Sequence, residues 1–225
     1  MLRPNFSSQA GNVLIIILIA IALIAALTAA IQGTSNTANI DRESLILKRS
    51  ELISFTSELE RAIVYIQQNG ISETDIRFSH PELHSDYGDL SADIDKTDQV
   101  FAREGGGAQY RVAPSGINDG SAWEFYGHTS LPETGSTRAD LLAVLPNVTE
   151  GFCDIINDTV GYTQRPQDSG ICIHNAPTSR FNNSTQFQTS PNQVTTSTFS
   201  ASPVKQGCVQ CDDDNLHFFY VLMTR

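Results

Sequence analysis

Four cysteines, Cys153, Cys172, Cys208 and Cys211, are the residues of this chain best suited to covalent chemistry. Two disulfides among them can form in three ways. We favour Cys153–Cys172 together with Cys208–Cys211. The first bond would tie a predicted helix to the loop that follows it, and the second would fasten the start of the last predicted strand. Disulfides persist in oxidising compartments, so this interpretation depends on where the chain resides.

Two other chemistries for the Cys208-Val209-Gln210-Cys211 segment are less well supported. A thioredoxin-like motif needs its first cysteine at a helix N-terminus, which lowers the thiol pKa. Here Asp212-Asp213-Asp214 follows at once and would raise that pKa. A zinc site needs a second pair of closely spaced ligands, and Cys153 and Cys172 are too far apart in sequence to form one. We therefore expect no metal at these cysteines.

His80 and His84 are spaced as a zinc-binding pair would be on a helix. Pro81 allows a helix only if the helix begins there, and the order H-E-x-x-H of metalloproteases is missing from the sequence. We expect a solvated turn at this position.

Two groups of acidic residues could supply the several carboxylate oxygens that Ca²⁺ prefers. Neither group has the spacing of an EF-hand, so we expect solvated loops that contribute to the net charge of −11. The groups are Asp93, Asp95 and Asp98, and separately Asp212–Asp214.

The sequence offers little for catalysis. It contains no G-x-S-x-G motif and no convincing pair of nucleophile and base, and Gly105–Gly107 precedes a strand-like segment where a phosphate loop would precede a helix. The acidic charge balance argues against a nucleic-acid-binding surface. We predict that the protein is not an enzyme, needs no cofactor and has no nucleic-acid partner.

An unbroken apolar run from Val13 to Ile31 would decide on which side of a membrane the rest of the chain lies. At about 1.5 Å per residue, a helix of this length comes close to the ~30 Å hydrocarbon core of a bilayer. No charged residue lies between Arg3 and Asp41, and Asp41-Arg42-Glu43 carries a net negative charge. The positive-inside rule therefore places the N-terminus in the cytoplasm and the chain after about residue 34 outside it.

Three fates are open to such a segment. A secretory signal peptide would be removed after a site such as Thr28-Ala29-Ala30, although the run is longer than a usual signal core. A signal anchor would remain uncut in the membrane. A prepilin-type segment would be cut on the cytoplasmic side of the run.

The third fate is favoured by a resemblance. Gln9-Ala10-Gly11, followed by the run that begins Asn12-Val13-Leu14, resembles the N-terminus of type IV pilins and type II secretion pseudopilins. In that family a dedicated peptidase cuts after the glycine, and the apolar helix becomes the core of a filament. The resemblance covers residues 1 to about 70 and implies a leader at 1–11 with processing between Gly11 and Asn12. Members usually carry glutamate where this chain has Ile16, so the chain resembles a minor subunit that sits at a filament tip.

A second helix is predicted from Asn39 to Gly70, because apolar residues recur at a helical spacing along a polar rod. Asn69-Gly70 supplies the expected stop. Gln32–Thr37, a stretch of weak helix formers, is either a joint or a softened part of one continuous helix over 12–70. A stalk or short coiled coil behind an anchor would show the same spacing. The stripe consists of Leu45, Leu52, Leu59 and Ile66, with Phe55, Ala62 and Ile63 between them.

Residues 71–225 are long enough for one domain, and their pattern is rich in strands. A helix is predicted over Thr149–Val160, with Gly161 at its end. The region 178–203 is rich in Ser, Thr and Asn and is expected to form a long loop or weak edge strands. The other predicted elements are a hairpin of 99–103 with 109–113, a core strand over 122–126, a strand or helix over 141–145, and a buried strand over 216–223.

These elements predict an α+β protein in which the N-terminal helix packs its amphipathic half on an antiparallel sheet. The resemblance implies a pilin-like fold and a structural role as a minor pilin or pseudopilin of a type IV pilus or type II secretion filament. Its partners would be membrane lipid, other pilin or pseudopilin subunits, assembly-platform proteins and the prepilin peptidase. It would cross the inner membrane once, with its C-terminal domain in the periplasm or at the cell surface. The alternative is an uncleaved, membrane-tethered binding domain that uses the 178–203 region.

Overall fold

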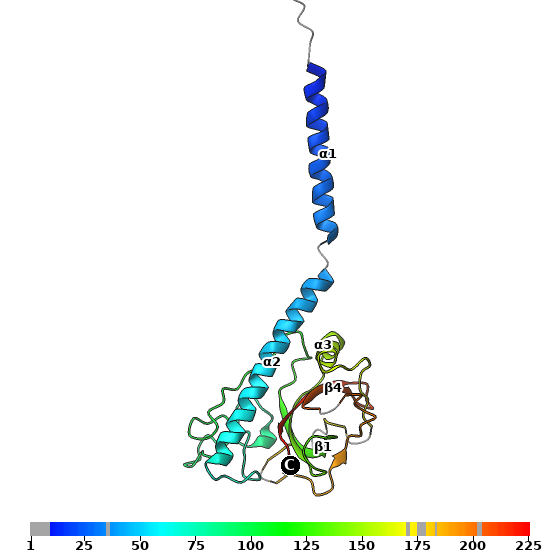
Figure 1. The fold of residues 1–225 in the computed structure, drawn as a ribbon. Helices are drawn as coiled ribbons and strands as arrows, with labels where there is room; N and C mark the ends of the chain where they lie inside the picture. The colour runs from blue at the N-terminus through cyan, green and yellow to red at the C-terminus, as the bar shows by residue number, and fades with distance from the viewer. Residues whose placement is uncertain (1–9, 35–36, 170–171, 175–178, 183, 202–203) are drawn as a thin grey trace, which may run out of the picture. The chain divides into compact units, whose positions relative to one another are not determined.

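A computed structural model describes the chain except for residues 1–9, 35–36, 170–171, 175–178, 183 and 202–203 (Figure 1). Among residues 10–40, side chains are described at 15–26 and 28. The chain divides into two units, Met1–Glu43 and Ser44–Arg225. Most of the predicted leader, and the centre of the predicted joint at Gln32–Thr37, lie outside the described residues.

The first unit contains helix α1 (Ala10–Thr34), which includes the whole predicted apolar run. Its described side chains are all exposed, and the large ones from Ile15 to Ile24 keep between 52% and 65% of their surface accessible. The hydroxyl of Thr28 donates a hydrogen bond to the carbonyl of Ile24 (2.8 Å). Over the described residues, none of the helices combines the length and apolar character needed to cross a membrane.

Helix α2 (Thr37–Gln68) corresponds to the predicted amphipathic helix. Its apolar stripe is buried at Leu52, Leu59 and Ile66, as the seven-residue spacing predicted. The amide of Gly70 donates to the carbonyl of Gln67 (2.9 Å), and Gly70 has a φ of +89°, which favours glycine. The helix therefore ends where the sequence places its stop.

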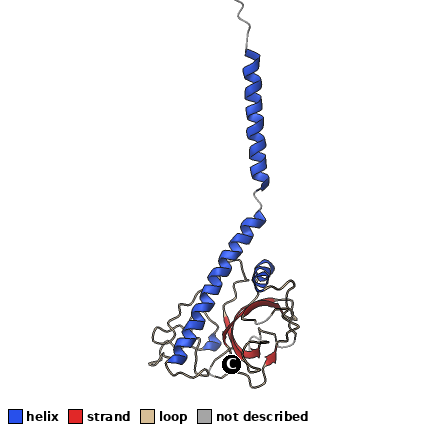
Figure 2. Ribbon diagram, viewed as in Figure 1, coloured by secondary structure: helices blue, strands red, loops and turns tan. Residues whose placement is uncertain are grey.

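The second unit is built on a five-stranded sheet with the order β3-β1-β2-β5-β4 (Figure 2). Its strands are β1 (Glu124–Ser130), β2 (Asp140–Leu145), β3 (Asn192–Gln193), β4 (Gln206–Gln210) and β5 (Leu216–Met223). Strands β1, β2, β5 and β4 pair antiparallel, whereas the short β3 runs parallel to β1. The predicted α+β class is confirmed, but the sheet is mixed and not purely antiparallel.

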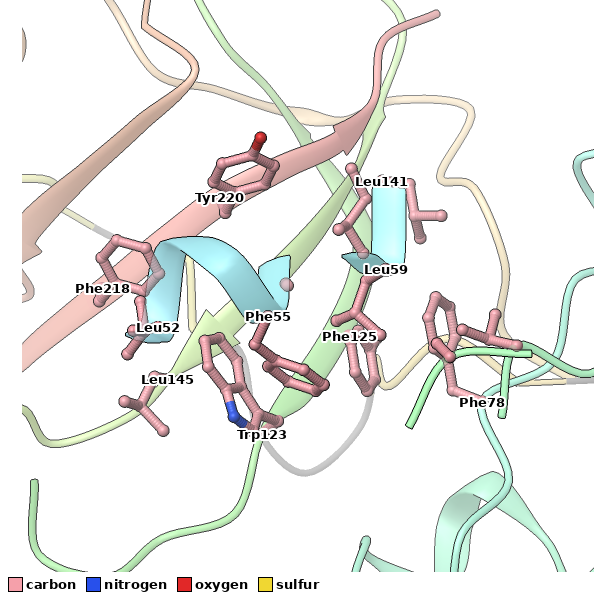
Figure 3. Close-up of a cluster of buried hydrophobic side chains, with 14 of the residues drawn as sticks. Leu52, Phe55, Leu59, Phe78, Trp123, Phe125, Leu141, Leu145, Phe218 and Tyr220 are labelled. Carbon is pink, nitrogen blue, oxygen red and sulfur yellow. The ribbon is translucent and has the colours of Figure 1, made fainter. Parts of the chain in front are cut away.

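Helix α2 and one face of the sheet share a single buried cluster (Figure 3). Phe55 of α2 lies with its ring centre 5.4 Å from that of Trp123, the only tryptophan of the chain. The hydroxyl of Tyr220 on β5 donates to the Glu60 carboxylate (2.8 Å) at the edge of this contact. The cluster unites strand and helix residues that include Leu52, Phe55, Leu59, Phe125, Leu141, Leu145 and Phe218.

Helix α3 (Glu150–Val160) follows Thr149, which has the extended backbone of an N-cap. Gly161 closes the helix in the left-handed conformation (φ +84°), and its amide donates to the carbonyl of Asp158. The predicted helix over Thr149–Val160 is thereby confirmed. The predicted strand over 216–223 is also confirmed, and 141–145 proves to be a strand.

The predicted hairpin of 99–103 with 109–113 is wrong, because the segment folds into consecutive turns. The amide of Gly106 donates to the carbonyl of Gln99 (2.9 Å), which closes the turns. A Cβ at Gly106 would lie 2.8 Å from that of Ala62 on α2. It would also lie 2.6 Å from the carbonyl oxygen of Val100, so glycine is needed there for close approach both to the turn and to the helix, whereas the sequence predicts a loop between strands. The predicted core strand at 122–126 begins later, at Glu124, and continues to Ser130.

The second face of the sheet carries its own buried cluster, and we call the described residues between Tyr162 and Val204 the cover. The cover contributes to this cluster Tyr162, Cys172, Ile173, Val194, Phe199 and Val204. Phe181, Val194 and Phe199 anchor the Ser/Thr/Asn-rich region 178–203 to the domain, and β3 is the strand assigned among its described residues. The cover has little regular secondary structure among its described residues, and it brings His174 and Arg180 into contact with Glu124 of β1.

Candidate functional site

The predicted processing site lies at the start of α1. Gly11 and Asn12 are both in its first turn, directly before the apolar run. Their side chains are outside the described part of the structure. Cleavage after Gly11 stays a prediction.

The disulfides are present, but the favoured pairing is wrong. The bonds are Cys153–Cys208, which ties α3 to β4, and Cys172–Cys211, which ties the cover to the end of β4. Cys208 belongs to the cluster on the α2 side of the sheet and Cys211 to the cluster on the opposite side. Two strand residues three apart point to opposite faces, so neighbours in sequence could not pair here.

A cluster of polar side chains is buried on the second face of the sheet. Glu124, Tyr126 and His128 alternate along β1 and therefore point to the same face. His217 joins them from β5 and is only 1% exposed. We refer to these four residues, together with His174 and Arg180 of the cover, as the histidine cluster.

The cover supplies the charge partners of this cluster. Nε2 of His174 donates to Oε2 of Glu124 (3.1 Å), and Nη2 of Arg180 donates to Oε1 of the same carboxylate (2.8 Å). Nη1 of Arg180 donates to Asp86 (2.8 Å), which lies in a short 3-10 helix, η1 (Ser85–Tyr87). The ring of His174 stacks on that of His217, with centroids 4.5 Å apart. The Arg180–Glu124 ion pair, the His174–Glu124 hydrogen bond and a ring stack thus fix the cover to the sheet.

Burial controls the protonation of these groups. It lowers the pKa of His217 to about 4, an effect that the neighbouring His174 strengthens. Burial also lowers the pKa of His128, against the opposing effect of its hydrogen bond to the carbonyl of Cys172. For Glu124, burial raises the pKa, but the hydrogen bonds from His174 and Arg180 outweigh burial, so the net pKa is lowered. At neutral pH the cluster holds neutral His217 and His128 beside an ionised Glu124.

Three buried polar atoms of the cluster have no hydrogen-bond partner among the described residues. They are Nδ1 of His128, Nε2 of His217 and the hydroxyl of Tyr126. A buried polar atom without a partner costs free energy, so each such atom in a folded protein calls for an explanation. Their gathering in one place makes the histidine cluster the strongest candidate for a ligand site.

One group of metal-ligating side chains adjoins the cluster. Ligand atoms of Cys211, Asp213 and His217 all lie within 4.8 Å of one another. The described part of the chain contains no second group of three or more metal-ligating side chains as close as this. Sequence reasoning found no partner pair for the Cys208–Cys211 segment because it considered only cysteines close in sequence. The fold supplies Asp213 from the β4–β5 turn and His217 from β5 instead.

The other predicted candidates are turns. His80 and His84 each accept, through Nδ1, the backbone N–H two residues further on (both 3.2 Å), so they stabilise local turns and the second caps η1. Asp95 and Asp213 likewise accept from the backbone two residues on. The side-chain hydrogen bond from Thr97 lowers the pKa of Asp95, and that from Asn215 lowers the pKa of Asp213.

A hollow of about 630 Å³ on the domain has none of the histidine cluster in its lining. Its lining is nearly all amide and hydroxyl groups, from residues 163–167, Ser197, Thr198, Ser200 and Gln210. The one charged side chain, Arg165, is paired with Asp154 (2.8 Å) and Glu150 (3.2 Å). The hollow thus suits an uncharged polar ligand.

Sequence reasoning missed the histidine cluster. His128, His174 and His217 lie far apart in the chain and follow no common motif. The alternation of Glu124, Tyr126 and His128 was the available signal, since a strand with polar groups at every second position has a polar face.

Comparisons of the chain with models of protein families, with characterised proteins and with solved structures found no match.

Proposed function

We propose that this protein is a structural subunit, a minor pilin or pseudopilin, of a type IV pilus or type II secretion filament. One observation carries the proposal: the apolar helix α1 has the Gly11-Asn12 dipeptide in its first turn, and the next helix in the chain is built into a sheet domain. In the family that the N-terminus resembles, this order of elements serves insertion, processing and assembly.

The exposed apolar surface of α1 supports this role. Large side chains from Ile15 to Ile24 are exposed on all sides of the helix, and a helix that is apolar all round needs lipid or other apolar helices around it. Burial of each methylene from water is worth about 0.8 kcal/mol, while transfer from lipid to a helix bundle contributes far less. Assembly from the membrane would therefore need energy from an assembly platform.

The disulfides agree with the location that the proposal requires. Both lie in the second unit, and disulfides persist in oxidising compartments such as the periplasm. The protein would hold its N-terminus in the cytoplasm, cross the inner membrane once and place residues 44–225 outside. Prepilin peptidase, neighbouring subunits and membrane lipid would be its partners.

Substitution at Gly11 tests the proposal. Gly11→Leu should block processing and assembly, because the peptidase of this family requires the glycine. Ala20→Leu adds similar bulk within α1 and should still be processed. Intact mass of both variants, recovered from a host that carries the peptidase, is the measurement. Processing of Gly11→Leu would contradict the proposal, and so would failure of the unsubstituted chain to be processed.

A second function, an uncleaved membrane-tethered binding domain, is favoured by the polar hollow of residues 163–167 and 197–200. Its uncharged amides and hydroxyls suit a glycan. A glycan array probed with the full chain in detergent would support this function if binding were seen and then lost in Thr198→Trp, which would fill the hollow. Absence of binding would leave the structural role as the proposal.

A further inference from the structure

We propose that the Cys172–Cys211 disulfide occupies a zinc site, in which Cys172, Cys211, Asp213 and His217 bind Zn²⁺ when the disulfide is reduced. The proposal concerns the second unit alone and does not depend on the structural role proposed above.

The turn between β4 and β5 brings three of the ligands together. Val209 on β4 pairs with His217 on β5, so both point to the second face of the sheet. Cys211 lies two residues beyond Val209 and points to the same face. Asp213 sits in the turn itself, and its ligand atom lies within 4.8 Å of those of Cys211 and His217. Ligands of a tetrahedral zinc ion are about 3.5 Å apart, so small side-chain rotations would close the site.

Cys172 supplies the fourth ligand. Its sulfur is bonded to that of Cys211, so it already lies at the site. Two thiolates, one imidazole and one carboxylate are all established types of zinc ligand, and four of them complete a closed tetrahedral shell. In the oxidised protein the two sulfurs are joined and neither is a thiolate, so the disulfide and the metal exclude each other.

His217 shows that the site has an unused ligand. The side chain is almost fully buried, its Nδ1 accepts one long hydrogen bond from the amide of Asn147 (3.4 Å), and its Nε2 has no partner among the described residues. Stacking on His174 limits rotation of the ring. Zinc binds neutral imidazole through a nitrogen lone pair, so transfer of the ring proton from Nε2 to Nδ1, at the expense of the long contact with Asn147, would free Nε2 for the ion.

The cover would hold Cys172 in place after reduction. Nε2 of His128 donates to the carbonyl of Cys172 (3.1 Å), and further along the cover Arg180 pairs with Glu124 and Asp86. These contacts do not depend on the disulfide. The freed thiol would therefore stay near the thiol of Cys211, which lowers the entropy cost of binding the metal.

The chemistry needs a dithiol reductant. One of its thiolates attacks a sulfur of the disulfide to form a mixed disulfide, and its second thiol releases the protein as two free thiols and the reductant as a cyclic disulfide. The protein disulfide thus gains two electrons and two protons, which the dithiol loses. Zn²⁺ then replaces the two thiol protons, which are released to solvent.

Cys153–Cys208 provides the internal control. It lies on the other face of the sheet, and the polar side chain beside it is Asn157, whose amide lies 3.8 Å from Sγ of Cys153. The described residues place no group of metal-ligating side chains there. Reduction of this bond should create no zinc site.

The test uses full-length chain in detergent, reduced with a dithiol that is then removed without oxygen, and titrated with Co²⁺ and Zn²⁺. The variant Cys153→Ser/Cys208→Ser retains the proposed site, and Cys172→Ser/Cys211→Ser removes it. We expect the first to bind one Co²⁺ with the sulfur-to-cobalt absorption of tetrahedral thiolate coordination, displaced by Zn²⁺, and the second to lack that absorption. Equal absorption in both variants, or none in the first, would overturn the proposal.

Two further measurements keep the result decisive. Asp213→Asn changes an exposed side chain and should weaken zinc binding at least about tenfold, since even substitutions in the shell outside the ligands cost 10–100-fold. Unchanged affinity would exclude Asp213 and contradict the four-ligand site. If reduction unfolds Cys153→Ser/Cys208→Ser, Zn²⁺ must restore its circular dichroism, and failure to do so would also overturn the proposal.

Discussion

Truncation of Leu59 should show that α2 belongs to the folded domain. Leu59 has no exposed surface and lies in the cluster that α2 forms with the sheet (Figure 3). Leu59→Ala removes three carbons, and at about 0.8 kcal/mol each their transfer term is about 2.4 kcal/mol. The cavity left among rigid neighbours adds to this, so we expect a loss of about 3–4 kcal/mol in the free energy of unfolding.

Trp123 is the natural probe for this experiment. It is the single tryptophan, is buried, and contacts α2 through Phe55. Urea unfolding of the full chain in detergent, followed by its fluorescence, measures the change. Leu47→Ala is the matched control, because Leu47 is on the same helix but 72% exposed, and should change stability by less than about 0.5 kcal/mol. Equal losses in the two variants, or no loss in Leu59→Ala, would refute the packing of α2 on the sheet.

Three further predictions concern the second face and the edge of the sheet. Asn157→Ala should lower the free energy of unfolding by about 1–3 kcal/mol, measured by urea unfolding. The buried side-chain amide of Asn157 accepts from the N–H of Cys208 (2.9 Å) and donates to its carbonyl (3.0 Å), which satisfies the outer edge of β4. An unchanged urea midpoint would contradict this role. Cys153→Ala/Cys208→Ala should lower the free energy of unfolding by about 2–4 kcal/mol, because the Cys153–Cys208 disulfide closes a loop between residues 55 apart. Thermal unfolding measures this loss. The pKa of His217 is lowered from 6.5 to about 4, so between these pH values the unfolded chain binds a proton that the folded chain does not. The free energy of unfolding should therefore fall as the pH decreases through this window. An NMR titration midpoint near 6.5 for His217 would contradict this prediction.

The elements that could be predicted are those whose signal is local. Leu216–Met223 is a continuous apolar run of strand length, and the structure places β5 over those residues. The seven-residue spacing from Leu45 to Ile66 identified α2, and Thr149 with Gly161 bounded α3. Each of these segments carries its own period or cap, so no distant contact was needed to identify it.

The rest depends on contacts between distant parts of the chain. β4 has the sequence QGCVQ, which shows little strand pattern, and it forms because β5 and Asn157 satisfy its two edges. The disulfide pairing depends on the face of the sheet on which each cysteine lies, and the separation of the cysteines in the sequence does not indicate that face. The glycines at 105–107 resemble a hairpin loop in sequence, but close approach to the backbone of Val100 and to Ala62 is what requires Gly106.

The candidate site residues also divide into those identified by a local sequence signal and those that depend on contacts between distant parts of the chain. Gly11 and Asn12 are identified by a local motif, and the cysteines by their type. The histidine cluster was missed because its members meet only when the irregular cover folds onto the sheet, and that cover has no sequence period.

The intact mass and N-terminal sequence of the protein isolated from its native membrane test the central proposal most directly. A mature chain that begins at Asn12 is the predicted result, and it would establish prepilin-type processing in spite of Ile16 at the position usually held by glutamate. A chain that retains residues 1–11, or one cut after the apolar run, would contradict the proposed role as a filament subunit.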